Sequence, residues 1–183
     1  PLLFGITDGK AIGTYLEHRF GQYLQEHYSV TLGNSAEGID LPELEIDFKI
    51  TSIRQPQSSC PFRSARQKVY GLGYSLLIFV YEKSDDALSA TANLTIRHTI
   101  FVEKSHTADF QTTSGLTRLL ANSANEEDII AFLQERMLPL DDIQATTLAQ
   151  EILQTPPQQG YLTISNALQW RLQYTRAIEQ AGM

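Results

Sequence analysis

The sequence predicts an α/β protein with a mixed central sheet flanked by helices and an added helical segment near residues 109–154. Three observations support this class: helical hydrophobic spacing before residue 28, β-type runs between residues 44 and 102, and helical spacing after residue 106. Because the β-type runs follow one another while helices precede and follow them, we expect one sheet with helices packed on its faces.

The first helix is expected over residues 7–28. Ile12 and Phe20 belong to an apolar stripe that repeats every four residues, which places these side chains on one helix face. Thr7 or Asp8 can cap the first turn, because a short oxygen-bearing side chain accepts a hydrogen bond from a free backbone amide. This helix should therefore cover one side of the sheet.

Three strands are expected in the middle of the chain. Residues 44–52 alternate between apolar and charged side chains, which predicts a half-buried strand with a charged row on one face. Residues 74–81 are almost continuously apolar, as in a central strand, and 94–102 form a further strand. The stretch 52–64 is rich in Pro, Ser and Gln and predicts a loop, and the polar stretch 82–93 predicts a connection.

The last part of the sequence predicts mainly helices. Apolar residues return to a spacing of three and four, and Pro156 and Pro157 end the run because proline cannot continue a helix. The expected elements are helices at about 109–121, 125–137 and 140–154, a short strand at 160–164, and a final helix capped by Ser165 and ending near Gln180.

Length and composition limit the possible classes of protein. At 183 residues we expect a single domain over 1–183, and a start at Pro1 instead of Met indicates processing or a longer parent chain. The single cysteine, Cys60, excludes an internal disulfide, which favours a reducing compartment. We find no signal peptide, and the longest apolar run, 76–81, is far too short to cross a membrane. These observations predict a cytoplasmic protein without a membrane partner.

Charge is distributed unevenly along the chain. The formal net charge is −7, which taken alone argues against nucleic-acid binding. Residues 48–81, however, contain five Lys or Arg side chains and no Asp or Glu. Net charge is a sum, whereas a binding surface is local, so this basic window remains a candidate for phosphate contact.

The strand at 44–52 carries the most informative residues. Asp47 and Lys49 point to the same face with Cα atoms about 6.7 Å apart, and Asp40 precedes them across a Leu-Pro turn. Two carboxylates can hold Mg²⁺, a hard cation, and a nearby ammonium can orient water and offset charge on a phosphate. The alternative is an exposed strand with a surface ion pair worth under about 1 kcal/mol.

The sequence around this strand resembles a nuclease family. KAIGTYLE ending at Glu17, then Gly38, Asp40, Leu44 and IDFKIT are similar to the pattern of the MutH-like branch of the PD-(D/E)xK nucleases. That branch contains a mismatch-repair nicking endonuclease and several type II restriction endonucleases. The resemblance implies a restriction-endonuclease-like fold and Mg²⁺-dependent, sequence-specific cleavage of duplex DNA.

Carried over residue by residue, the resemblance implies four catalytic residues. Asp40 and Asp47 would be the metal ligands, Lys49 the catalytic lysine, and Glu17 a helix carboxylate that helps to organise the site. The seven-residue spacing from Asp40 to Asp47 matches the pattern. Two departures are that Asp47 replaces a Glu and that the gap between Glu17 and Asp40 is longer than in the family.

The basic window supplies candidates for DNA contact. Arg and Lys can bind phosphates, and Gln between them can pair with a base edge in the major groove. The alternative is a polar loop that contacts no base. The candidate DNA-binding residues are Arg54, Gln55, Gln57, Arg63, Arg66, Gln67 and Lys68.

We favour a type II restriction endonuclease over a mismatch-repair nickase, because the basic Ser/Gln/Pro loop and the helices at 109–154 are not expected in the repair enzyme. A non-catalytic DNA-binding module and an RNA nuclease remain alternatives. Mg²⁺ and double-stranded DNA are the expected cofactor and partner. A homodimer and a cognate DNA methyltransferase are candidate partners in a prokaryotic cytoplasm.

Overall fold

A computed structural model describes residues 3–33, 38–60, 63–165 and 170–182. The chain divides into two compact units. Unit 1 comprises Pro1–Ser58 and Ser75–Val102, and unit 2 comprises Ser59–Tyr74 and Glu103–Met183. Both combine helices with a small sheet, which confirms the predicted α/β class and its restriction-endonuclease-like layout of mixed sheet and flanking helices. The extent of a single nuclease domain over 1–183 stays a prediction.

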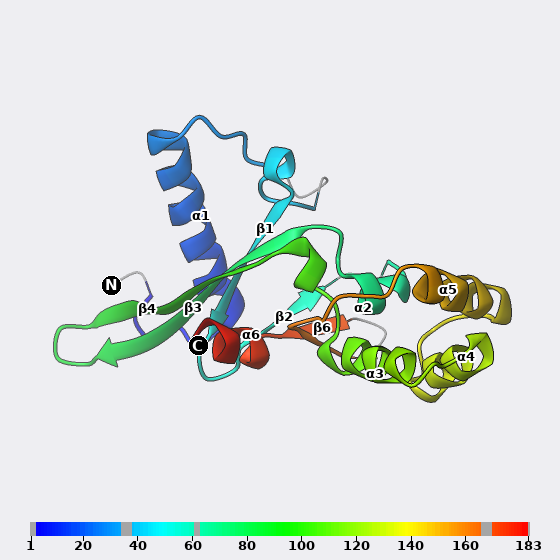
Figure 1. Cartoon of the computed structure of the whole chain (residues 1–183). Helices are drawn as coiled ribbons and strands as arrows, with labels where there is room; N and C mark the ends of the chain where they lie inside the picture. The colour runs from blue at the N-terminus through cyan, green and yellow to red at the C-terminus, as the bar shows by residue number, and fades with distance from the viewer. Residues whose placement is uncertain (1–2, 34–37, 61–62, 166–169, 183) are drawn as a thin grey trace. The chain divides into compact units, whose positions relative to one another are not determined.

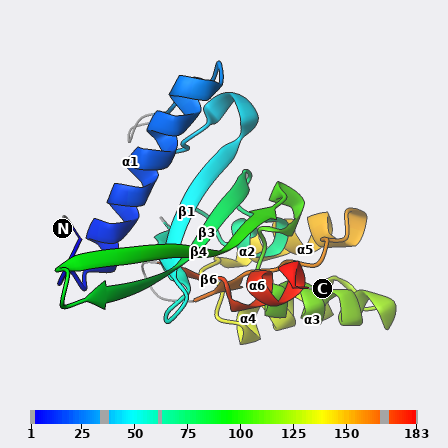
Figure 2. The ribbon, with the colours of Figure 1, turned by 90° about the vertical axis from the view of Figure 1, so that its left-hand side faces the viewer.

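Unit 1 is a three-stranded mixed sheet with a long helix beside it (Figures 1 and 2). Its strand order is β1-β3-β4, with β1 parallel to β3 and β3 antiparallel to β4. The elements are α1 Gly9–His27, the short 3₁₀ helix η1 Pro42–Leu44, β1 Ile46–Ser52, β3 Ser75–Asp86 and β4 Thr91–Val102.

The predicted first helix is confirmed, and its position follows from its apolar stripe. Asp8 caps α1 by accepting a hydrogen bond from the Lys10 amide at 3.0 Å. Phe20 packs edge-on against Phe48 of β1 and Phe79 of β3, with ring centroids 5.0 and 4.7 Å apart. These aromatic contacts hold α1 on one face of the sheet.

Strand β1 differs from the prediction of a half-buried strand. Asp47 and Phe48 point to opposite faces, yet they are only 5% and 6% exposed. Leu44, expected on the apolar face, lies in η1 instead and is exposed. The charged row therefore begins inside the protein, where a carboxylate is costly unless it has partners.

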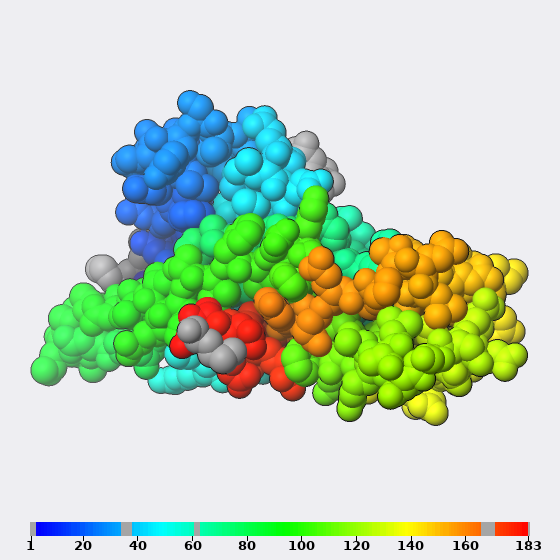
Figure 3. Space-filling view, in the orientation of Figure 1, coloured from blue at the N-terminus to red at the C-terminus, as the bar shows by residue number. Residues whose placement is uncertain are grey.

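The hairpin of β3 and β4 is longer than predicted. The polar connection expected at 82–93 was wrong, because Glu82–Asp86 pairs with Thr91–Thr95 and only 87–90 form the turn. This part of the hairpin has no buried apolar face. Backbone hydrogen bonds between the strands and surface ion pairs such as Arg97 with Glu82 stabilise it instead. The hairpin ends in an exposed tip (green, at the left of Figure 3). Leu88, in the turn of this hairpin, is fully accessible.

Unit 2 consists mainly of helices around an apolar core. Its small sheet has the order β2-β6-β5, in which β5 and β6 are antiparallel. Among the described residues, no helix of either unit is long and apolar enough to cross a membrane. The elements are β2 Gln57–Cys60, whose first two residues belong to unit 1, α2 Arg66–Tyr70, the 3₁₀ helix η2 Lys104–His106, α3 Phe110–Ala121, α4 Glu126–Glu135, α5 Asp142–Gln154, β5 Thr163–Ile164, β6 Trp170–Gln173 and α6 Thr175–Ala181.

The helical segment predicted at 109–154 is confirmed. Helix α4 has a capping box in which Asn125 and Asp128 exchange side-chain and backbone hydrogen bonds. Leu116, Ile129 and Ile152 are completely buried and bring α3, α4 and α5 into one apolar core. The periodic spacing in the sequence was sufficient here because each helix buries one continuous stripe.

Two predictions in unit 2 were wrong. The stretch predicted as a loop at 52–64 contains strand β2. The final helix from Ser165 is instead strand β6 followed by α6, although its residues 166–169 lie outside the described part. The Ser165 hydroxyl accepts from the Arg171 amide at 2.9 Å across the hairpin. Buried Leu172 and Tyr174 alternate with exposed neighbours, which is the period of a strand.

Candidate active site

Unit 1 contains a cleft of about 560 Å³ beside α1 and the start of β1. The four residues predicted to be catalytic all line it: Glu17, Asp40, Asp47 and Lys49. Glu17 comes from α1, Asp40 from the segment before η1, and the other two from β1. The fold thus brings together residues that are up to 32 positions apart in the sequence.

The regular geometry of β1 positions Asp47 and Lys49. Parallel pairing places Asp47 opposite Leu76 and Lys49 opposite Ile78 on β3, so both side chains share one face. The Lys49 ammonium lies 2.6 Å from Asp47 Oδ2. A central strand with completely buried Leu76 and Ile78 keeps this pair on a rigid support.

A tight turn returns Asp40 to the same strand. Leu41 pairs with Ile46 across η1, and Glu45 takes a left-handed conformation with φ of 52°. The Phe48 amide donates a hydrogen bond to Asp40 Oδ2 at 2.6 Å. This backbone contact fixes the Asp40 carboxylate next to Asp47, although Asp40 lies outside the strand.

The cleft concentrates negative charge. Burial is the main factor that raises the pKa of Asp47, which reaches about 6; Lys49 opposes the rise and the neighbouring Asp40 carboxyl adds to it. The pKa of Glu17 is also raised, first by partial burial and then by Asp40, while Lys49 and His18 act in the opposite direction. Three carboxylates therefore face one lysine, and a bound cation would relieve their repulsion.

The donor set fits a hydrated Mg²⁺ ion. Among the described residues, no group of three or more His, Cys, Asp or Glu side chains is arranged to hold a metal. Asp40 and Asp47 form a pair of neighbouring oxygen donors, and Glu17 is not a third ligand of that group. Mg²⁺ commonly uses one or two carboxylates and completes its shell with water and substrate phosphate.

Part of the predicted DNA-binding set lies in unit 1, directly after β1. Arg54 and Gln55 are exposed and Gln57 is half-buried. The buried Thr51 hydroxyl shapes this turn, because it accepts from the Gln57 amide at 3.0 Å and contacts the Gln55 carbonyl at 3.2 Å. The turn thus leaves the Arg54 side chain accessible to a phosphate.

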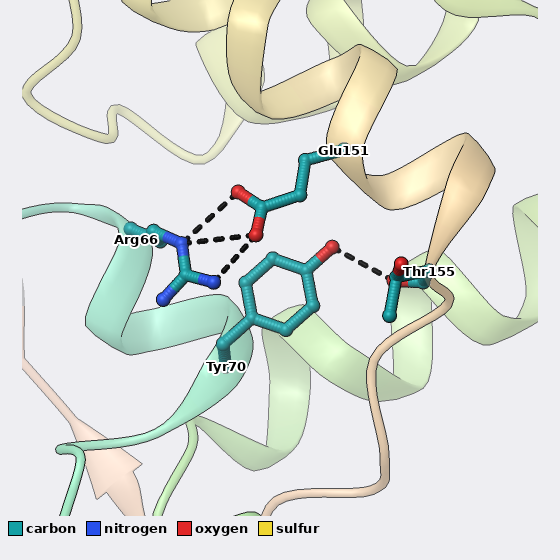
Figure 4. Close-up of polar contacts among 4 residues, drawn as sticks. All are labelled: Arg66, Tyr70, Glu151 and Thr155. Atoms are coloured by element: carbon teal, nitrogen blue, oxygen red, sulfur yellow. Dashed lines mark hydrogen bonds and ion pairs between the residues drawn. The ribbon is translucent and has the colours of Figure 1, made fainter.

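The remaining predicted DNA-binding residues lie in unit 2, where three of them have structural partners. Arg66 binds the Glu151 carboxylate through Nε and Nη2 and stacks on Tyr70 at 4.5 Å (Figure 4). The Gln67 amide donates to the Leu72 carbonyl at 3.2 Å. Lys68 is only 4% exposed. Of the four, Arg63 is the one that is exposed and has no such partner among the described residues.

Several residues that line the cleft were not predicted from the sequence. His18, Gln22 and Gln25 lie on the same face of α1 as Glu17. Their spacing of four and three residues was visible in the sequence, but polar residues on a helix are usually solvent-facing, so the pattern was not informative alone. His18 is exposed at this cleft.

Comparison with known proteins identifies the class of enzyme. The family described as type II restriction enzyme NspV matches residues 1–183, and no solved structure matches the chain. A curated protein named "Type II restriction enzyme NspV" from Nostoc sp. is 63% identical over 182 residues, which are 100% of this chain and 83% of the relative. These similarities define a type II restriction enzyme, an endodeoxyribonuclease that acts on DNA at specific sequences. The chain belongs to the NspV family of type II restriction enzymes.

Proposed function

We propose that this restriction enzyme cleaves DNA in the cleft of unit 1 with Mg²⁺ held by Asp40 and Asp47. The observation that supports this most strongly is the hydrogen bond from the Phe48 amide to Asp40, which places a second carboxylate beside Asp47 and Lys49. This arrangement and the seven-residue spacing resemble the PD-(D/E)xK pattern, which supports our proposal that the enzyme belongs to the MutH-like branch of those nucleases.

The reaction requires water to attack phosphorus as the bond from phosphorus to the leaving sugar oxygen breaks. A bound Mg²⁺ ion would polarise the phosphoryl group and make a coordinated water more acidic. The Lys49 ammonium, 2.6 Å from Asp47, can orient the attacking water and offset the charge that develops on the phosphate oxygens. Glu17 adds negative potential at the edge of the cleft, which favours cation binding.

We propose that exposed residues after the catalytic strand bind the DNA backbone and bases. Arg54, Gln55 and Gln57 follow β1 directly, and Arg63 is accessible on unit 2. Arg66, Gln67 and Lys68 would have to release partners or leave a buried position within unit 2 to contact DNA. A homodimer, a cognate DNA methyltransferase and a prokaryotic cytoplasmic location complete the proposal.

The test is plasmid cleavage by the wild-type protein and by Asp40→Asn, each with Mg²⁺ and with EDTA. We expect discrete linear fragments from the wild type in Mg²⁺, no cleavage in EDTA, and at least about 10³-fold slower cleavage by the variant. Glu43→Gln is the matched control, because it removes an exposed carboxylate three residues away. Wild-type cleavage by Asp40→Asn would show that the metal site lies elsewhere.

A further inference from the structure

The cleft extends along α1 beyond the four proposed catalytic residues. Glu17, Gly21 and Gln25 are spaced by four residues, and His18 and Gln22 lie beside them, so one helix face lines the wall. Gly21 is buried, and a Cβ atom at this position would lie 3.1 Å from Leu32 Cδ1. The loop therefore approaches the helix closely at Gly21, and the polar side chains on either side border open space.

The two glutamines on this face have free hydrogen-bonding capacity. Gln22 donates one N–H to Glu26 at 3.0 Å, which orients the Gln22 amide along the helix. The Gln25 side chain makes no hydrogen bond within the described part of the chain. An amide carries two donors and one acceptor, so these side chains can bind a ligand that offers oxygen acceptors.

We propose that Gln25, assisted by Gln22, binds phosphates of the cleaved DNA strand a few nucleotides from the scissile phosphate. This inference rests on the proposed function, because it requires the acidic end of the cleft to hold the scissile group. It assigns the far end of the same cleft to the neighbouring nucleotides of that strand.

Charge explains why amides suit this position better than cations. Asp40, Asp47 and Glu17 already attract cations, and an arginine on the adjacent helix turn would compete with the metal for these carboxylates. A glutamine donates hydrogen bonds to phosphate oxygens without neutralising the carboxylates. It therefore holds the strand near the metal site and leaves the negative potential of that site intact.

The helix also has the appropriate length. At a rise of 1.5 Å per residue, Glu17 and Gln25 are separated by about 12 Å along α1. This separation equals the axial rise of about three to four nucleotides of one strand. The contacted phosphates should therefore lie within about four nucleotides of the cut.

The decisive experiment combines Gln25→Ala with neutral methylphosphonate replacements in the DNA. A duplex with the cleavage site mapped on plasmid DNA carries one replacement at each phosphate within four nucleotides of the cut, and binding is measured by fluorescence anisotropy. We expect Gln25→Ala to weaken binding about 10-fold. One methylphosphonate should weaken wild-type binding by a similar factor and have no further effect in the variant.

Two results would contradict the proposal. One is wild-type affinity of Gln25→Ala, and the other is an equal loss from every methylphosphonate in both proteins. Gln134→Ala is the matched control, because Gln134 is an exposed glutamine on α4, and it should bind like the wild type.

Salt dependence provides a second, independent measurement. Because glutamine is neutral and displaces no counterion, Gln25→Ala should leave the slope of log affinity against log salt unchanged. Arg54→Ala should reduce that slope by about one. A reduced slope for Gln25→Ala would contradict a neutral contact.

These binding measurements separate this inference from the proposed function. If Asp40→Asn cleaves like the wild type, the metal site is misassigned, whatever the anisotropy shows. If Asp40→Asn is inactive and Gln25→Ala has the affinity and the methylphosphonate response of the wild type, only the glutamine contact is wrong.

Discussion

Each unit contains a prominent pair of a cation and a carboxylate, and the two pairs behave in opposite ways. In unit 1, Lys49 meets the buried Asp47, whose pKa rises because of burial and the nearby Asp40. In unit 2, Arg66 meets the partly exposed Glu151, whose pKa falls mainly because of its hydrogen bonds to Arg66. The same charge types thus destabilise the charged form of the carboxylate in unit 1 and stabilise it in unit 2.

The difference lies in the surroundings of each pair. Arg66 and Glu151 are a balanced pair, and the neighbouring Tyr70 contributes a stacked ring and a 2.8 Å hydrogen bond to the Thr155 carbonyl (Figure 4). Asp47 shares a single lysine with two further carboxylates. A balanced pair stabilises a fold, whereas an unbalanced buried group is typical of a binding or catalytic site.

The largest expected difference between the two pairs is in catalysis. Lys49→Ala should slow cleavage of plasmid DNA by about 10³-fold or more, because it removes the ammonium that we propose offsets charge on the reacting phosphate. Arg66→Ala should change the rate by less than about 10-fold, since its guanidinium is used to bind Glu151. A wild-type cleavage rate for Lys49→Ala, or complete loss of cleavage in Arg66→Ala, would contradict the functional distinction between the two pairs.

The next effect is the pH dependence of stability without metal. The folded pKa of Asp47 is about 6 and the ordinary value is 3.8, so the native state retains a proton that the unfolded chain loses between these values. The stabilisation of the native state by this retained proton is complete below pH 3.8. It is lost as the pH rises through about 6. From pH 3.8 to 7.5 the loss is about 3 kcal/mol.

Urea unfolding in EDTA measures this loss. The difference in unfolding free energy between Asp47→Asn and the wild type should shift by about 3 kcal/mol in favour of the variant as the pH increases from 4 to 7.5. Mg²⁺ should stabilise the wild type at pH 7.5 and not the variant, because a ligand that binds the native state stabilises it. If the difference in unfolding free energy stayed constant across this pH range, the pKa of Asp47 would not be raised by folding.

The smallest effect should come from the pair in unit 2. A double-mutant cycle with Arg66→Ala and Glu151→Ala should give a coupling free energy of about 1 kcal/mol, because both side chains are partly exposed and screened by water. The coupling should decrease in high salt and as acid protonates Glu151. A coupling as large as that of a buried pair, or one insensitive to salt, would contradict the comparison.

Much of the fold was predictable where periodicity is strong. The stripe containing Ile12 and Phe20 predicted α1, and the apolar run at 74–81 predicted the first part of β3. The second part of β3, Glu82–Asp86, is polar and pairs only with β4, so composition gave no sign of a strand. The final helix predicted from Ser165 was wrong. The apolar residues around Leu172 also fit helical spacing when they are combined with the apolar residues that follow, so the pattern did not distinguish a strand from a helix.

The candidate site was predicted in outline by a motif, and its geometry was not. Spacing suggested that Asp40, Asp47 and Lys49 could meet, but it could not show the 2.6 Å hydrogen bond from the Phe48 amide that holds Asp40. Basic residues near the strand predicted DNA contact equally for Arg54 and Lys68. Folding leaves Arg54 exposed and buries Lys68, a difference that depends on long-range packing.

The sequence by itself determined which chemical groups are present, the periodicity of the main helices and the spacing of Asp40, Asp47 and Lys49. These properties are local, because a helix face or a strand face is set by neighbouring residues. Only the tertiary structure decided which carboxylates lie together in the cleft, which cations are already paired, and which face of α1 lines the cleft. Burial and electrostatic repulsion depend on residues that are distant in the chain, so the strained Asp47 and the balanced Arg66–Glu151 pair appear only after folding.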